Sequence, residues 1–312
     1  LYMGEDRFRL VTRADFDGVV AGGLLIELDI VDQEVLFAEP RDVQQGRVDI
    51  TPRDITTNLP FVDGVHLCFD HHVSETVRVG EHKNHIIDPN APSAARVVYE
   101  YYGGENAFPK ISTEMMEAVD KADAARYSER DILAPSGWAL LNFLIDPRTG
   151  LSRLNNFSTS NDEFMRDMMV YCRHHPVEEI LAIPEVEERL RVFQEHEELA
   201  EMQIKRCATI DGNVVVADLR EEDPIYVCNR FLLYGIYPSA QVSINVLPGD
   251  TDDKILLAVG KSILNRGSNA NIGLLMLEQG GGGHEGVGTC QIAKDDAESV
   301  LVDLIGAIKQ AG

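Results

Sequence analysis

The chain lacks any hydrophobic run long enough to cross a membrane, because its longest apolar stretches, such as GVVAGGLLIELDI, are short and interrupted by charge. Its polar opening, LYMGEDRFRL, does not have the pattern of a secretory signal. The five cysteines are Cys68, Cys172, Cys207, Cys228 and Cys290, and no CxxC spacing occurs among them. Neither a disulfide framework nor a zinc site is therefore indicated. These absences predict a cytoplasmic protein without a membrane contact.

Basic residues are also scarce. The chain has 28 lysines and arginines against 52 aspartates and glutamates, which gives a net charge of −24. A field of this sign repels long polyanions and anionic lipids, so the composition argues against duplex DNA as a partner. A small phosphate-bearing substrate stays compatible with it, because bound metal ions reverse the sign of the charge inside a pocket.

The first third of the sequence alternates strand-like and helix-like segments. Short apolar runs bounded by turn residues predict strands, and longer runs with helical spacing predict helices. Strands that alternate with helices indicate α/β architecture with a mostly parallel sheet, whose carboxyl edge is where ligands bind. We expect strands at 8–12, 34–38, 64–70 and 84–88, and helices at 18–29 and 93–103.

Residues 112–207 are almost entirely helical in pattern, and the last part, 184–207, carries the many charges expected of a connector between domains. From residue 208 the strand pattern restarts, which predicts a second, smaller α/β domain. Its expected elements include a strand at 213–219 and a helix at 225–235. We predict an N-terminal domain over 1–183, a helical linker over 184–207 and a C-terminal domain over 208–312.

Two aspartates follow the first predicted strand. Asp15 and Asp17 are two positions apart, so in an extended stretch both carboxylates point the same way and can face one ion or one ion pair. Hard divalent cations bind such oxygen ligands, as in sites of phosphoryl chemistry. Either aspartate could instead cap the helix that begins near Gly18. The pair alone therefore leaves a metal site and a helix cap as alternatives.

Three further potential ligands follow the strand predicted at 64–70. Asp70, His71 and His72 stand directly after the apolar HLCF. At the mouth of a buried parallel strand, such a triplet indicates a metal site in which one imidazole is a ligand and its neighbours orient it. The alternative is an accidental surface cluster.

Two later segments also carry candidate residues. In AVDKADAARY, Asp120 and Asp123 are three apart and share a helix face, although an exposed helix end would have the same pattern. In LEQGGGGHEG, four glycines at 280–283 precede His284. Glycines let backbone amides approach an anion closely, and a histidine at the rim can donate to phosphate. This segment predicts a phosphate-binding loop, with a flexible loop as the alternative.

The order of these motifs, DxDG, DHH, a later aspartate and GGGGH, resembles the DHH phosphoesterase superfamily with a DHHA1-type C-terminal domain. The resemblance extends over nearly the whole chain. Within the superfamily it is strongest to the proteins described as exopolyphosphatase-related or nanoRNase-like. It implies a DHH metal-binding catalytic domain, a helical linker and a DHHA1-type substrate-binding domain.

The resemblance implies two divalent ions, usually manganese, at the carboxyl end of the parallel sheet. A bridging aspartate would be Asp49 or Asp54, and we prefer Asp54 because the turn-rich TTNLP after it resembles the exit from a strand. Asp70 would support the ligands, and His72 would act in catalysis near the substrate phosphate. The remaining ligands that the resemblance implies are Asp15, Asp17, His71 and Asp123.

The resemblance also implies that the C-terminal domain binds the substrate. Its glycine-rich loop would bind phosphate, and Arg266 would bind the far end of the substrate. The loop residues are Gly281, Gly282, Gly283 and His284.

Arg13 departs from the family pattern. The family commonly has a histidine two or four residues before the first aspartate, where this chain has Arg13 and Val11. A guanidinium group has only donors and stays charged, so Arg13 is not a metal ligand. It could pair with Asp15, supply part of the charge of one ion, or hold a phosphate, and we assign it to catalysis.

We therefore predict a metal-dependent phosphoesterase in which one or two Mn²⁺ ions, or Mg²⁺, activate water for in-line attack on phosphorus. The expected substrates are short single-stranded oligonucleotides, nucleotide bisphosphates, cyclic dinucleotides or polyphosphate. Because members of this superfamily are often dimers, the resemblance also implies that this chain could form a homodimer. The alternative is a nucleotide-binding or regulatory protein with a degenerate metal site and little catalysis, since the first-motif histidine is missing.

Overall fold

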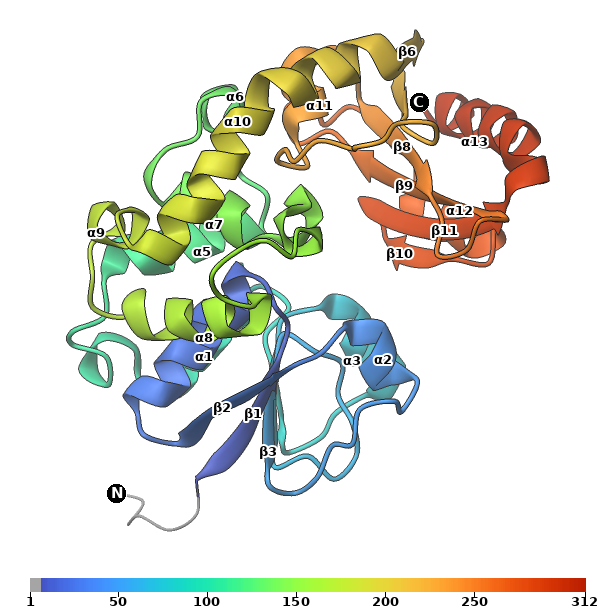
Figure 1. Cartoon of the computed structure of the whole chain (residues 1–312). Helices are drawn as coiled ribbons and strands as arrows, with labels where there is room; N and C mark the ends of the chain where they lie inside the picture. Colours follow the sequence, from blue (N-terminus) through green and yellow to red (C-terminus); the bar gives the residue numbers. More distant parts are fainter. Residues whose placement is uncertain (1–6) are drawn as a thin grey trace. The chain divides into compact units, whose positions relative to one another are not determined.

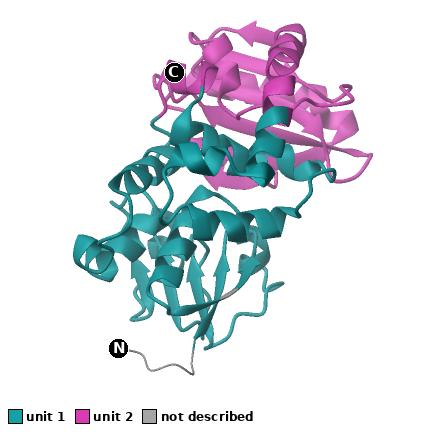
Figure 2. Ribbon diagram, turned by 60° about the vertical axis from the view of Figure 1, so that its left-hand side comes forward, with its two compact units in different colours: residues 1–126, 135–191 teal, residues 127–134, 192–312 magenta. Residues whose placement is uncertain are grey.

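The computed structural model describes residues 7–312, apart from the side chain of Gln33, and it divides the chain into two compact units (Figure 1, Figure 2). Unit 1 contains the described residues up to Arg126 together with Pro135–Arg191, and unit 2 contains Tyr127–Ala134 together with Val192–Gly312. The predicted fold class is confirmed, because unit 1 is α/β with a parallel sheet and unit 2 is α/β with a mixed sheet. The domain bounds drawn at residues 183 and 207 stay a prediction.

Unit 1 is built on five parallel strands in the order β2-β1-β3-β4-β5. Since all five run in the same direction, their carboxyl ends meet at one edge of the sheet. The sequence analysis predicts four of these strands and omits β3, which is only four residues long. The strands are β1 (Phe8–Thr12), β2 (Val31–Phe37), β3 (Asp54–Thr57), β4 (Leu67–Asp70) and β5 (His85–Ile87).

Both faces of this sheet are covered, as the alternation of side chains along β1 shows. On one face, Gly22 of helix α1 (Phe16–Glu27) packs so closely that a Cβ there would lie 2.9 Å from Leu10 Cδ2. On the other face, Val11 packs with Val43 of helix α2 (Pro40–Gln44). Neighbouring residues of a strand point to opposite faces, so a fully apolar strand is buried between two layers.

Helix α1 is the centre of the helical layer of unit 1, because it contacts α4, α5 and α8. Because other helices surround it, α1 contains few polar residues. All ten positions from Phe16 to Leu25 are buried. The other helices of unit 1 are α3 (Val73–Val79), α4 (Ala94–Tyr101), α5 (Thr113–Asp123), α7 (Gly137–Ile145), α8 (Asn161–Tyr171) and α9 (Val177–Leu181), and the short 3₁₀ turns are Gly104–Asn106, Pro147–Thr149 and Leu151–Arg153.

Unit 2 contains a six-stranded sheet in the order β10-β11-β9-β8-β7-β6, in which only β7 and β8 pair in parallel. Its strands are β6 (Ala208–Asp211), β7 (Val214–Asp218), β8 (Val242–Pro248), β9 (Lys254–Lys261), β10 (Gly282–His284) and β11 (Val287–Ala293). Val214 and Val216 of β7 face the core that contains α12 (Ile272–Glu278) and α13 (Ala297–Ala311), whereas Val215 and Ala217 face a second core.

The helix predicted over 184–207 is present as α10 (Pro184–Cys207), and its later part packs Ala200 and Ile204 into the second core of unit 2. The helix predicted over 225–235 is wrong for most of its length, because only α11 (Leu232–Ile236) is helical there. The segment before α11 is bonded instead to side chains of α10. His196 Nδ1 accepts from Val227 N at 3.0 Å, and Gln203 Oε1 accepts from Tyr226 N at 3.1 Å. The short helix α6 (Glu129–Leu133) also belongs to unit 2.

Among the described residues, no helix is long and apolar enough to cross a membrane. The five cysteines are all free thiols, three of them buried.

We expect Ile55→Ala to lower the free energy of unfolding by about 2–5 kcal/mol, because Ile55 is fully buried in the central strand β3 and its loss leaves a cavity. Urea unfolding followed by the fluorescence of Trp138, the single tryptophan, measures this in unit 1. Val77→Ala, at a side chain that is 86% exposed, is the matched control and should change stability by no more than about 0.5 kcal/mol. Equal effects of the two substitutions would contradict the central position of β3.

Candidate active site

Polar side chains gather at the carboxyl edge of the sheet in unit 1. Arg13, Asp15 and Asp17 follow β1, and Asn58 follows β3. β4 ends at Asp70, with His71 and His72 next along the chain, and α5 ends at Asp123. The ends of three neighbouring parallel strands thus deliver candidate residues to one place, as the fold class predicts.

The loop between β1 and α1 is held tightly by Asp15 and Gly18. Asp15 is the N-cap of α1, because its Oδ1 accepts the Gly18 amide at 3.0 Å. A Cβ at Gly18 would lie 2.0 Å from the carbonyl oxygen of Arg13, so only glycine fits at this point. The helix-cap alternative is therefore correct for Asp15, and the loop it fixes also sets the position of Asp17.

Asp17 is fixed by a second helix. It is buried, and its two carboxylate oxygens accept the backbone amides of Ala94 and Ala95 at 2.9 and 2.7 Å. These amides belong to the first turn of α4, where unpaired N–H groups and the helix dipole favour an anion. Each carboxylate oxygen keeps a second lone pair, so the carboxylate is held firmly and can still bind a cation.

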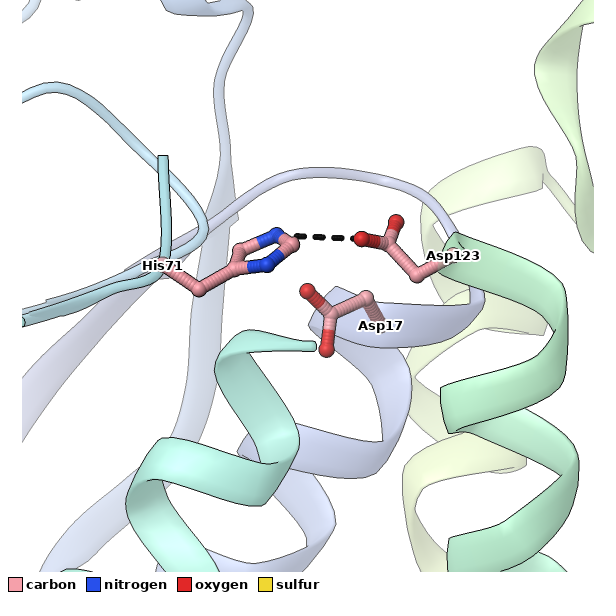
Figure 3. Close-up of side chains that lie close together, drawn as sticks. All are labelled: Asp17, His71 and Asp123. Atoms are coloured by element: carbon pink, nitrogen blue, oxygen red, sulfur yellow. Dashed lines mark ion pairs between the residues drawn. The ribbon is translucent and has the colours of Figure 1, made fainter. Parts of the chain in front are cut away.

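Asp17, His71 and Asp123 form a compact group that suits a divalent ion (Figure 3). One ligand atom from each residue lies within 4.8 Å of the other two. His71 Nδ1 lies 3.2 Å from the carbonyl oxygen of Ala91, which in the neutral imidazole places the proton on Nδ1 and leaves the lone pair on Nε2 for a metal ion. Nε2 is buried and lies 3.0 Å from Asp123 Oδ2, but without the geometry of a hydrogen bond. A buried imidazole nitrogen beside two carboxylates is the donor set expected for a metal ion.

The charges of this group are mutually dependent. Burial, and then the neighbouring Asp123, raises the pKa of Asp17. Burial alone would lower the pKa of His71, but Asp123 and Asp17 outweigh it and raise that pKa to about 9. Burial also disfavours the charged form of Asp123, yet His71 lowers its pKa overall. Without a metal, a proton on His71 supplies positive charge beside the buried Asp17 and the partly exposed Asp123, and a divalent ion would take its place.

Asp70 orients His72 rather than joining this group. It is fully buried, and its Oδ1 lies 2.6 Å from His72 Nδ1 and accepts the His71 amide at 2.8 Å. Burial would lower the pKa of His72, but Asp70 outweighs it and raises that pKa. The pair therefore favours the charged form of the His72 imidazole and fixes its Nδ1 beside Asp70.

Asp15 does not join the group either. Its neighbours are the side-chain amide of Asn58, whose Nδ2 donates to Oδ1 at 3.1 Å, and Arg13, whose Nε lies 3.4 Å from Oδ2. The sequence analysis misses Asn58, because it does not recognise the strand that ends just before it. The β-branched run DITT is the signal that could have found it.

Arg148 is a second residue that the sequence analysis misses. Its Nε donates to Asp146 Oδ1 at 2.6 Å. Burial would lower its pKa, but Asp146, and then Asp15 and Asp123, outweigh this and raise it. The guanidinium group of Arg148 thus interacts electrostatically with both Asp15 and Asp123.

The structure corrects the placement of Asp54. It begins β3, whereas the cluster lies beyond the end of that strand, about 13 Å further along at 3.3 Å per residue. Its carboxylate is taken by Arg9, whose Nε and Nη2 donate at 2.7 and 2.8 Å, and by the Thr51 amide at 2.6 Å. Asp49, the other candidate, is exposed and precedes β3 as well. Neither aspartate reaches the carboxyl edge.

Asp120 also has a structural role. It accepts from Ser93 Oγ at 2.8 Å and from Arg96 Nη2 at 2.6 Å, and it thereby joins α5 to the first turn of α4. Of the two aspartates on this helix face, only Asp123 belongs to the group formed with Asp17 and His71.

The glycine-rich segment of unit 2 is ordered by backbone pairing. Gly282–His284 forms the edge strand β10 against β11, and the Gly281 amide donates to the Met276 carbonyl at 2.8 Å. His284 and Arg266 are exposed, the first at the end of β10 and the second in the loop after β9.

Comparisons with solved structures match 43 chains, among them the following three. The chain is 48% identical, with a TM-score of 0.84, to the pGpG-specific phosphodiesterase PggH from Vibrio cholerae, over 98% of this chain and 100% of that one. It shares the fold of an exopolyphosphatase-related protein from Bacteroides fragilis, with 12% identity and a TM-score of 0.52 over 96% of this chain and 92% of that one. It also shares the fold of RecJ from Thermus thermophilus, solved with Mn²⁺, with 14% identity and a TM-score of 0.53 over 97% of this chain and 52% of that one. No protein-family model and no curated protein matches the chain.

The chain belongs to the DHH phosphoesterase superfamily, since it matches a member over its whole length at 48% identity. It is a phosphohydrolase of the DHH type, and enzymes of this type depend on divalent metal ions. The predicted family and enzyme class are thereby confirmed. The result favours catalysis over the alternative of a binding protein with little activity.

We expect Asp54→Asn to lower the free energy of unfolding at pH 7 by about 1–3 kcal/mol, because a buried carboxylate loses its pairing with the partly exposed Arg9. Burial raises the pKa of Asp54, but Arg9 and Thr51 outweigh it and lower that pKa. This stabilisation is therefore present above the unfolded pKa of about 4 and lost as pH falls through the folded pKa. The difference between the two proteins should shrink in urea titrations below about pH 4.

The same variant separates a structural role from a metal ligand. Mn²⁺ binding, measured by isothermal titration calorimetry, should be unchanged by Asp54→Asn. Weakened Mn²⁺ binding in a folded variant would restore Asp54 as a ligand.

Proposed function

We propose that this enzyme hydrolyses the linear dinucleotide pGpG. The observation that carries the proposal is the 48% identity, over 98% of the chain, to a pGpG-specific phosphodiesterase. Addition of one water molecule across the single 3′–5′ phosphodiester bond of pGpG gives two molecules of GMP. The substrate is short and single-stranded, which is compatible with the net charge of −24.

We further propose that Asp17, His71 and Asp123 hold the divalent ion, and that this ion is Mn²⁺, with Mg²⁺ as the second choice. The donor set of two carboxylates and one imidazole supports this, since both ions accept oxygen ligands and manganese accepts imidazole more readily. The ion supplies Lewis-acid activation of the scissile phosphate and of the attacking water.

The side chains around this group supply the remaining electrostatic contributions. Arg13 is 27% exposed, and its fixed positive charge can bind a non-bridging oxygen of the scissile phosphate, where negative charge grows in the transition state. His72 is 32% exposed, and with Nδ1 bonded to Asp70, a proton on Nε2 is available for the leaving 3′ oxygen. His72 and Arg13 are thus the proposed catalytic residues.

In unit 2, we propose that His284 and Arg266 bind the anionic groups of the nucleotide. The exposure of both side chains supports this role. Gly281, Gly282 and Gly283 are the further residues proposed to bind phosphate, although the Gly281 amide is already bonded to the Met276 carbonyl. A homodimer and a cytoplasmic location stay predictions from the sequence.

The purified chain with Mn²⁺ should convert pGpG to GMP. Anion-exchange chromatography of the reaction mixture measures the substrate and the product. His71→Ala and Asp123→Asn should each lower kcat/KM by about 100-fold or more, because each removes a donor of the group that binds the ion. Asp49→Asn is the matched control, since this carboxylate is exposed and lies before β3, and it should leave turnover unchanged.

A substrate panel tests the specificity. Longer oligoribonucleotides, a cyclic diguanylate and polyphosphate should be hydrolysed more slowly than pGpG. No turnover of pGpG, or turnover that survives His71→Ala, would refute the proposed function.

A further inference from the structure

We propose that the active site binds a single divalent ion per chain. Asn58 and Arg13, which contact Asp15, together with the positive charge of Arg148, take the place of a second ion there. The proposal rests on the metal group of the proposed function. It adds two residues, Asn58 and Arg148, that the sequence motifs do not include.

The carboxylate of Asp15 is surrounded by donors. Its Oδ1 accepts from the Gly18 amide at 3.0 Å and from Asn58 Nδ2 at 3.1 Å. Its Oδ2 lies 3.4 Å from Asn58 Nδ2 and 3.4 Å from Arg13 Nε. A carboxylate offers about four lone-pair directions, so little of this one is left for a cation.

Asn58 is fixed in a way that disfavours a metal. Its amino group is the part that can donate to a carboxylate, so Nδ2 faces Asp15 and the carbonyl Oδ1 points elsewhere. The residue is buried, its φ is 55°, and its backbone amide donates to the Phe69 carbonyl at 3.0 Å. Asparagine tolerates this left-handed conformation better than most residues. An amide N–H directed at the site repels a cation, and the neutral side chain adds no charge to attract one.

Two guanidinium groups carry the positive charge instead. Arg13 lies beside Asp15, and Arg148 interacts with Asp15 and Asp123 while its Nε is bonded to Asp146. Both groups stay charged at any physiological pH. A second divalent ion at Asp15 would therefore meet two fixed positive charges and a carboxylate already in use.

The group formed by Asp17, His71 and Asp123, in contrast to Asp15, is suited to a divalent ion. Asp17 is held by two backbone amides, and His71 Nε2 is buried without a hydrogen bond. Two carboxylates and a neutral imidazole balance the charge of one divalent ion. The two halves of the site therefore differ in charge, and only one of them suits a metal.

The number of bound ions tests the proposal directly. The full-length chain is stripped with chelator, titrated with Mn²⁺ to saturation, and freed of unbound metal by gel filtration. Elemental analysis should give one Mn²⁺ per chain, and electron paramagnetic resonance should show an isolated ion. Two ions per chain, a spin-coupled pair, or no bound ion would overturn the proposal.

The double variant Arg13→His with Asn58→Asp tests the cause. It replaces a cation and an amide with two potential ligands, so the saturated variant should bind two Mn²⁺ ions and show a spin-coupled signal. Asp49→Asn is the control and should keep one ion. A folded double variant that still binds one ion would show that Arg13 and Asn58 do not exclude the second. Should the variant fail to fold, as judged by Trp138 fluorescence, the count for the wild-type chain decides alone.

These outcomes are separate from the proposed function. One bound ion without hydrolysis of pGpG would support the single-ion site and refute pGpG as the substrate. Two bound ions with hydrolysis of pGpG would refute the single-ion site and support pGpG as the substrate.

Discussion

The active site depends on the burial of Asp17 at the carboxyl edge of the parallel sheet. A buried carboxylate is costly unless it is bonded, and Asp17 is bonded by the first two amides of α4. This contact joins the first turn of α1 to the helix after β5, so the sheet, α1 and α4 must all be in place together. His71 and Asp123 then complete a group whose charge requires a cation.

The charge in the rest of the site is arranged around that group. Asp70 is bonded to His72, and Asn58 and Arg13 contact Asp15. Arg148 is bonded to Asp146, and the charges of Asp15 and Asp123 also favour its positive charge. Asp70, Asp15 and Asp146 therefore each have a fixed side-chain partner. The positive charge beside Asp17 and Asp123 can come either from a proton on His71 or from a metal ion. In the proposed site with one ion, the fixed guanidinium groups would stabilise the charge that a second ion would otherwise stabilise during phosphodiester hydrolysis.

Much of this could be predicted from sequence, since the ends of strongly apolar strands are easy to recognise. Asp17 and His71 follow such strands, and their convergence follows from the parallel sheet. Asn58 and Arg148 could not be found in this way. The first follows a strand of only four residues, and the second acts through space from a 3₁₀ turn. The interpretation of Asp54 as a ligand fails for the same reason, because it places this residue at the wrong end of β3. The helix at 225–235 is also wrong for most of its length. Side chains of α10 bind the segment before α11, and such distant contacts leave no local pattern in the sequence.

The position of the metal tests this account most directly. A crystal of the chain soaked in Mn²⁺ and measured at the manganese absorption edge should show one anomalous peak within bonding distance of Asp17, His71 and Asp123. A peak bound to Asp15, or no peak at the three residues, would contradict it.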